Sequence, residues 1–409
     1  MTFPDPIALS TCRLGAESGH LRDAPRPPAQ RDERYAAQFD WDTLFYDVYR
    51  VGRHVVLQGP PLFNLLPLLR EDRAMARAFR WPFARAQHVG RDKRGEVWWH
   101  SEADRIALDG PLGTFDIAVQ PNLSRLFAGR RVLHTLSKNN AVRWIVDWIA
   151  FYVAVHGADA VLLYDNGSTI YTAEELQAQL RAAFPRLVIH VIDWSFPYGP
   201  QGGMAGAVDG IESPWDSDFC QTGSLQHARL RFLLDARSVL NVDIDEMVLS
   251  SQGRSIFAAT EQSRDGFIKF PGSWISTATP SAVTPIAVTP VDCRHGDFTF
   301  IDRQEPETCP PKWCIVPALR HARQHSWSVH NLFGAKQNKV LSDEFRYRHM
   351  KGISNSWKYD RWGDDAFDPQ RFHEDPDLRT AFEASGLIRA PTDALSSPAN
   401  AMATPAASW

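Results

Sequence analysis

Residues 239–246, Val-Leu-Asn-Val-Asp-Ile-Asp-Glu, indicate the fold class of this chain most directly. The first four form a short apolar run of the kind found in buried strands. Asp243 and Asp245 follow at its carboxyl end, separated by one residue, so both carboxylates point to the same side. A buried strand that ends in two acids predicts a polar ligand site at the edge of a sheet.

Upstream of this segment, strand and helix patterns alternate. Apolar runs predict strands, and longer amphipathic runs predict helices, one of which opens at the capping-box sequence 172–175. Such alternation predicts an α/β, Rossmann-like fold with a mainly parallel sheet and helices on both faces. Ligands of such sheets bind beyond the carboxyl ends of the strands. The expected strands are 132–136, 160–164, 187–192 and 239–242, and the expected helices are 141–155, 172–184 and 219–235.

Shifts in composition divide the chain into four parts. Residues 1–34, rich in Pro and charge, are expected to form a flexible leader. Short apolar runs between Gly and Pro predict a small, mostly β accessory region over 35–129. The alternating pattern occupies 130–388, and 389–409 is an Ala, Ser, Pro and Thr tail that we expect to be disordered.

Charge and apolar patterning exclude several classes of protein. The net charge of the 409 residues is −4 and the pI is about 6.4, which argues against a nucleic-acid-binding protein. The longest apolar stretch, 144–164, contains Asp147 and Asp159, so we expect no membrane span, although peripheral membrane association stays open. The start of the chain does not resemble a secretory signal, which predicts a cytoplasmic protein.

The five cysteines are an odd number at irregular spacing, so reduced thiols are expected. Cys293, His295, Cys309 and Cys314 do not have the paired spacing of a zinc site, and we interpret them as structural residues. The Asp243 and Asp245 pair suits a hard divalent cation instead. Mg²⁺ or Mn²⁺ held there would offset the charge of a nucleoside diphosphate as it departs.

Short motifs occur at 138–140, 147–148, 152, 156–157, 163–168, 221, 242–246, 312–317, 327–330 and 349–351. Together these motifs resemble glycosyltransferase family 92 (DUF23-like) and its bacterial, family 2-like relatives, which have the GT-A fold. The resemblance covers roughly residues 130–362 and departs from the family at Asn140, where Glu is usual, at Asp147, also usually Glu, and at Met350, usually aromatic.

The resemblance implies a metal-dependent, inverting hexosyltransferase that moves a sugar from a UDP-linked donor to a glycan or other hydroxyl acceptor, as in polysaccharide biosynthesis. The implied metal ligands are Asp243 and Asp245 with His330 or His349, of which we slightly prefer His330. Lys351, Lys358 and Arg361 form a basic cluster that would clamp a diphosphate, although a solvated helix face is the better interpretation of Arg361. The implied substrate-binding residues are Lys138, Asn139, Asp165, Asn166, Gln221, Asp243, Glu246, Lys312 and Lys351.

The base that activates the acceptor is the least determined part of the site. An inverting transfer needs a carboxylate or imidazole beside the acceptor hydroxyl. Asp297, Asp302, Glu305 and Glu307 lie in a suitable part of the chain, and we select Asp302 and Glu305. The Gly-rich stretch 199–210 is either a lid over the donor or a plain surface loop.

Two other functions compete with the transferase. A haloacid dehalogenase-type phosphatase would use Asp243 and Asp245, with Asp364-Asp365 as its late acidic pair, but its motif normally opens the fold. A non-catalytic carbohydrate-binding protein of the same fold is the second. Its sugar contacts would come from some of the 14 tryptophans.

Overall fold

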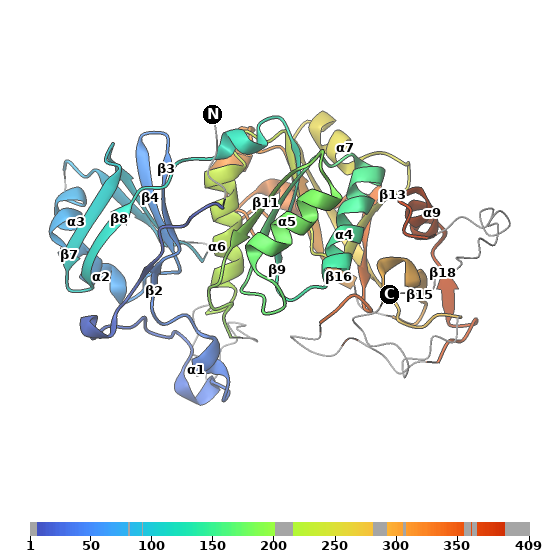
Figure 1. The fold of residues 1–409 in the computed structure, drawn as a ribbon, viewed down its shortest axis with the longest axis horizontal. Coiled ribbons are helices and arrows are strands. Elements are labelled where there is room, and N and C mark those ends of the chain that lie inside the picture. Colours follow the sequence, from blue (N-terminus) through green and yellow to red (C-terminus); the bar gives the residue numbers. More distant parts are fainter. Residues whose placement is uncertain are drawn as a thin grey trace, which may run out of the picture.

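The computed structural model describes residues 6–80, 82–91, 93–200, 216–280, 293–305, 308–355, 361 and 366–388. An N-terminal β-rich part lies beside a larger part built around one long, curled sheet (Figure 1). The tail 389–409, Lys358, the acidic pair at 364–365 and most of the Gly-rich stretch lie outside the described residues.

Four neighbouring parallel strands form the first half of the main sheet. They occur where apolar runs predict them, and they stand in the order β11-β10-β9-β12. The chain therefore moves outward from β9 to β11 and then returns to the other side of β9. The strands are β9 (Arg131–Ser137), β10 (Ala160–Asp165), β11 (Val188–Asp193) and β12 (Ser238–Asn241).

The second half of the sheet is mixed, so the expected α/β class is confirmed but "mainly parallel" holds only for the first half. The pairs β12/β16, β16/β14 and β17/β13 are antiparallel, and β14/β17 is parallel. Antiparallel neighbours need no crossover helix between them. The strands are β13 (Glu246–Ser250), β14 (Phe267–Ile275), β16 (Thr308–Ile315) and β17 (Phe345–Met350).

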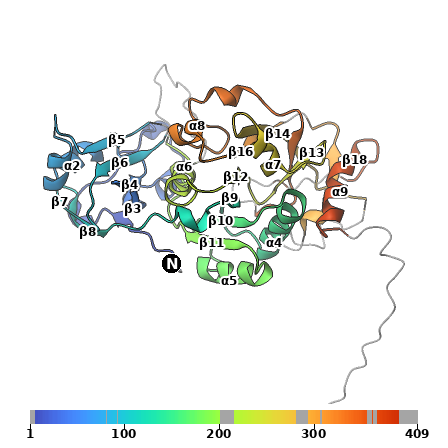
Figure 2. The same cartoon turned by 90° about the horizontal axis from the view of Figure 1, so that it is seen from above.

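Helices cover both faces of this sheet, as expected (Figure 2). Alternation along the strands supplies the two apolar faces: Leu133 and Leu163 pack on one side, and Val132 and Leu162 on the other. The first side carries α4 (Val142–Phe151), α5 (Ala173–Ala183), α7 (Ile256–Gln262) and α9 (Pro376–Ala384), and the second carries α6 (Phe219–His227).

Local signals in the sequence set several helix ends. Thr172 and Glu175 form the expected capping box, with N···O distances of 2.9 and 3.1 Å. Helix α4 continues as a π-helical turn, Tyr152–His156, and ends at Gly157, whose φ of 69° is left-handed. A π-helical turn, Ala228–Phe232, likewise extends α6.

The N-terminal part is mostly β and has its own apolar core. A four-stranded antiparallel sheet has the order β3-β4-β6-β5, and a hairpin and two short helices pack beside it. The elements are β2 (Thr43–Phe45), β3 (Asp47–Val51), β4 (His54–Gly59), α2 (Leu65–Glu71), α3 (Arg73–Ala78), β5 (Ala86–Val89), β6 (Gly95–His100), β7 (Arg105–Gly110) and β8 (Gly113–Ala118).

The expected flexible leader is packed instead, over residues 6–34. Strand β1 (Cys12–Arg13) pairs with β2, and the buried guanidinium of Arg22 donates to the carbonyl oxygens of Pro61 at 2.8 Å and Asp40 at 2.6 Å. A buried guanidinium needs such acceptors. The Pro and charge content of the leader therefore reflects irregular backbone held by tertiary hydrogen bonds.

A buried ionic cluster joins the two parts of the molecule. Asp47 of β3 accepts from Arg231 at 2.7 Å and lies 2.9 Å from Nε2 of His227, and all three side chains are fully buried. Burial favours the neutral acid, but Arg231 and His227 outweigh it and hold the pKa of Asp47 below its ordinary value. Nearby, a Cβ at Gly223 would lie 2.6 Å from the ring of Tyr46, so only glycine allows this close contact.

No helix in the described ranges is long and apolar enough to cross a bilayer. The remaining short elements are α1 (Tyr35–Gln38), β15 (Phe300–Asp302), α8 (Arg320–Gln324) and β18 (Phe372–Glu374), of which β15 and β18 pair with each other.

Candidate active site

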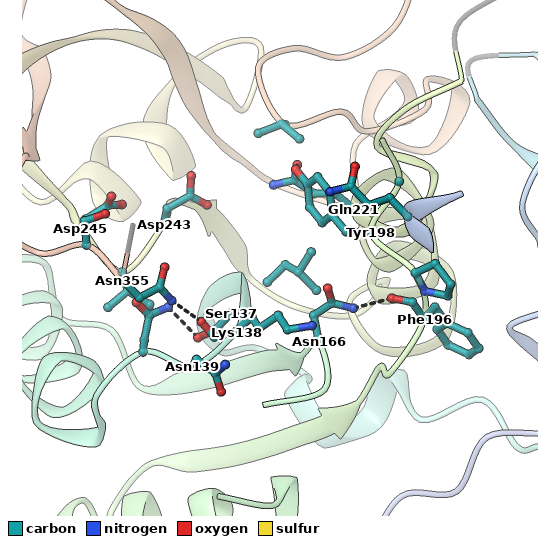
Figure 3. Close-up of a pocket in the computed structure, with 18 of the residues that line it drawn as sticks. Ser137, Lys138, Asn139, Asn166, Phe196, Tyr198, Gln221, Asp243, Asp245 and Asn355 are labelled. Atoms are coloured by element: carbon teal, nitrogen blue, oxygen red, sulfur yellow. Dashed lines mark hydrogen bonds between the residues drawn. The ribbon is translucent and has the colours of Figure 1, made fainter. Parts of the chain in front are cut away.

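A cavity of about 510 Å³ opens at the carboxyl ends of β9 and β12 (Figure 3). These two strands are parallel neighbours, but the chain leaves them in opposite directions across the sheet. Such a topological switch point is where open α/β sheets bind ligands. Several of the residues selected from the sequence line this cavity. They are Lys138, Asn139, Asn166, Gln221, Asp243, Asp245 and His330.

A buried lysine anchors the first aspartate. Nζ of Lys312 lies 2.6 Å from Oδ2 of Asp243 and 3.1 Å from Oε2 of Glu246, and its side chain is 1% exposed. Burial favours neutral Lys312, yet the two acids outweigh it and raise its pKa. Burial also raises the pKa of Glu246 to about 7, while Lys312 opposes this shift.

The carboxylate of Glu246 holds the backbone of the acidic segment 243–246 in place. Its Oε2 accepts a 2.8 Å hydrogen bond from the backbone N–H of Asp243, and the side chain is buried. It is absent from the cavity wall. Glu246 therefore positions Asp243, which differs from the substrate contact expected of it.

The second aspartate lies between two cationic groups. Oδ2 of Asp245 is 2.9 Å from Nε2 of His349 and 2.6 Å from Nη1 of Arg361. Although burial favours the neutral acid, these partners lower the pKa of Asp245. Burial would lower the pKa of His349, but the Asp245 carboxylate raises it to about 10. Arg361, interpreted from the sequence as part of a solvated helix face, is thus part of this cluster.

Of the two candidate histidines, His349 is the one that contacts Asp245. The ring of His349 stacks on Trp274 with centroids 4.1 Å apart, which fixes its orientation. His330 lines the cavity, and its Nδ1 lies 3.2 Å from the carbonyl oxygen of Pro311. Burial and the nearby Lys312 lower the pKa of His330 to about 4. The contacts therefore favour His349 over the sequence preference for His330.

Two loops, which follow β9 and β10, form the part of the cavity wall that we call the floor. The backbone N–H of Asn139 donates to Oγ of Ser168 at 2.8 Å, and the N–H of Thr169 donates to Oδ1 of Asn139 at 2.7 Å. Asn139 adopts a left-handed φ of 53°, which asparagine tolerates well. The carbonyl of Lys138 accepts from Nδ2 of Asn355 at 2.6 Å, which ties the floor to the late part of the chain.

Asp165 does not line the cavity. Its buried carboxylate accepts from the hydroxyl and the 3.1 Å backbone N–H of Ser168, and burial raises its pKa. Its neighbour Asn166 lines the cavity and donates to the carbonyls of Trp194 and Phe196, each at 2.8 Å. Asn166 therefore lines the cavity and Asp165 does not, because Asp165 closes its own turn.

The residues selected as catalytic bases lie outside the cavity wall. Asp302 of β15 is held by Arg371 at 2.7 Å, and Glu305 is ion-paired with Lys351. The Nζ of Lys351 also lies 5.6 Å from the centre of the Trp274 ring. These carboxylates flank the site and do not face the cavity that holds Asp243.

Sequence reasoning missed several lining residues. Ser137 directly precedes Lys138 at the strand end and was findable from that position. Tyr198, whose hydroxyl donates to Oε1 of Gln221 at 2.8 Å, follows β11 and had a weaker signal. Ala37 and Gln38 come from the N-terminal part, and no pattern near them indicates a site.

No family model matches the chain, and no curated protein matches it. In the described part of the chain, no group of three or more His, Cys, Asp or Glu side chains is arranged to hold a metal ion. All five cysteines are buried and form no disulfide. The ring of His295 is held by the backbone, with Nε2 2.9 Å from the carbonyl oxygen of Ile244. The site must therefore be interpreted from its own geometry.

Proposed function

We propose that this protein is a metal-dependent glycosyltransferase of the GT-A type, which transfers a sugar from a nucleotide-sugar, preferably UDP-linked, to a glycan or other hydroxyl acceptor. One observation carries the proposal: Asp243 and Asp245 line a cavity at the topological switch point of four parallel strands. Ser137, Lys138 and Asn139 from the adjacent strand end line the same cavity.

The donor atoms around Asp245 fit a divalent cation. Two ligands bound at right angles, each at the ~2.1 Å typical of Mg²⁺, lie roughly 3 Å apart. The Asp245 oxygen and His349 nitrogen are 2.9 Å apart. Nη1 of Arg361 lies 2.6 Å from the first and 3.0 Å from the second, so a positive group already suits this position.

Asp245 and His349 would hold the cation, with Asp243 beside them, and His349 would have to lose its extra proton to do so. Mixed oxygen and nitrogen ligands suit Mn²⁺. When bound, the cation would act as a Lewis acid toward the diphosphate. Lys312 holds the side chain of Asp243 in place through a 2.6 Å ion pair, and Glu246 fixes its backbone. Arg361, once it leaves Asp245, offers a planar cation to the diphosphate of the donor.

The phosphatase interpretation gains no support from the contacts. Accessibility alone does not exclude a nucleophilic Asp243, because its side chain is 37% exposed although Oδ2 contacts the buried Lys312. The acidic segment also follows β12, the fourth strand of the sheet along the chain, whereas the phosphatase motif opens its fold.

A screen of nucleotide-sugars tests the proposal. The full chain is incubated with UDP-, GDP- and other activated sugars in Mn²⁺, in Mg²⁺ or with EDTA, and release of the nucleoside diphosphate is measured. We expect release from one class of donor, lost on addition of EDTA. Release of phosphate from a phosphomonoester that depends on Asp243 would favour the phosphatase, and metal-dependent nucleotide binding without turnover would favour the non-catalytic binder.

A further inference from the structure

The N-terminal part of the chain contributes to the wall of the cavity. Ala37 and Gln38, at the end of α1, line it together with Tyr198 and Gln221. Asp243 lies more than two hundred residues away along the chain. Figure 1 shows α1 below the boundary between the two parts, away from the strands of the N-terminal sheet.

Buried contacts hold α1 in this position. The hydroxyl of Tyr35 donates to Oδ2 of Asp216 at 2.7 Å, and Arg26 binds both oxygens of that carboxylate at 2.8 and 2.9 Å. Tyr35 and Asp216 are both buried, and Phe39 packs edge-on against Phe219 of α6. A bidentate pair and a buried hydroxyl bond order a segment far better than a surface ion pair does. These contacts therefore hold helix α1 in place as part of the cavity wall.

The two ends of the cavity differ in chemistry. Asp243 and Asp245 lie at one end, and Phe196, Tyr198 and Gln221 lie at the other (Figure 3). Gln38 is next to Phe39, which packs on Phe219, two residues before Gln221. We therefore assign Gln38 to this second end, where aromatic rings and uncharged amides predominate. Aromatic rings stack on flat heterocycles, and amides read the donors and acceptors on their edges.

A nucleoside diphosphate has the same division into a charged end and a flat, uncharged heterocycle. We propose that α1 completes the subsite for the nucleobase and that the half-buried Gln38 helps to select the base through its side-chain amide. Within the described residues this amide has no hydrogen-bond partner of its own, so it is available to a ligand. This inference rests on the proposed function, because the charged end must hold the diphosphate.

Calorimetric titration of the full chain in Mn²⁺ tests the role of Gln38. UDP, GDP, CDP and ADP are compared with inorganic pyrophosphate, which has no base. Removing one neutral hydrogen bond should weaken binding of the preferred nucleotide about three- to tenfold in Gln38→Ala and reduce the preference among the four. Pyrophosphate should bind equally to the wild type and the variant, which a general loss of structure would not allow.

Gln87→Ala is the matched control, since Gln87 is an exposed glutamine of β5 that does not line the cavity. It should leave every affinity unchanged. If nucleotides bind but Gln38→Ala matches Gln87→Ala for all four, the base subsite is wrong and the proposed function stands. If no nucleoside diphosphate binds the wild type at all, the proposed function fails and this inference fails with it.

Discussion

Replacing Asp245 by alanine is expected to lower sugar transfer by about a hundred- to a thousandfold, the loss typical when one electrostatic contact to a developing charge is removed. The physical reason lies in the surroundings of Asp245. It is the carboxylate that contacts both His349 and Arg361. Without it, two positive groups remain where the metal should bind.

Initial rates of nucleoside diphosphate release over a range of Mn²⁺ concentrations measure this effect. Asp116→Ala, which removes an exposed carboxylate of the β7-β8 hairpin, is the control and should keep the wild-type rate. The unfolding midpoints of the Asp245 variant and the wild type are compared to establish that the variant is folded. A folded Asp245→Ala protein with an unchanged rate and metal response would place the metal site elsewhere.

Replacing Asp47 by alanine should lower the free energy of unfolding by about 3–5 kcal/mol, the usual cost of leaving buried charge uncompensated. Arg231 is fully buried and donates to Asp47 at 2.7 Å, and the same carboxylate oxygen also lies 2.9 Å from His227. Because β3 reaches α6 through this cluster, the loss falls on the junction of the two parts. Urea unfolding followed by tryptophan fluorescence measures it.

The matched control for this second variant is again Asp116→Ala. Its partner Arg105 is exposed, and an exposed ion pair contributes little to stability. A loss for Asp47→Ala no greater than that of the control would mean that the buried cluster does not hold the two parts together. The same experiment shows whether unfolding is one transition, as a shared buried cluster implies, or two.

The part of the fold that local patterns govern could be predicted from the sequence. Residues 131–193 alternate regularly, and Thr172 and Gly157 carry their own capping signals, so strands and helices occur where expected. The second half of the sheet was not predictable in this way. Strands β14, β16 and β17 pair across long separations, and their register depends on tertiary contacts such as that of Tyr347 with Gly272.

In the candidate site too, residues set by local position could be predicted, whereas residues set by distant contacts could not. Lys138, Asn139 and Asp243 follow directly from their positions after parallel strands, and they share one cavity. Asp165 follows its strand equally well, but Ser168 three residues later turns its carboxylate into the loop, an outcome that spacing does not reveal. Asp302 and Glu305 were selected by chain position alone, and their arginine and lysine partners come from elements distant in sequence.

The central claim is that a nucleoside diphosphate binds at Asp243 and Asp245 through a divalent cation, and thermal unfolding tests it most directly. The melting temperature of the full chain is measured with UDP alone, with Mn²⁺ alone and with both. A ligand at one hundred times its dissociation constant stabilises a protein by about 2.7 kcal/mol, so we expect an increase of several degrees only when both are present. An increase with UDP that is the same in Mn²⁺ and in EDTA, or no increase with any nucleotide, would contradict the account.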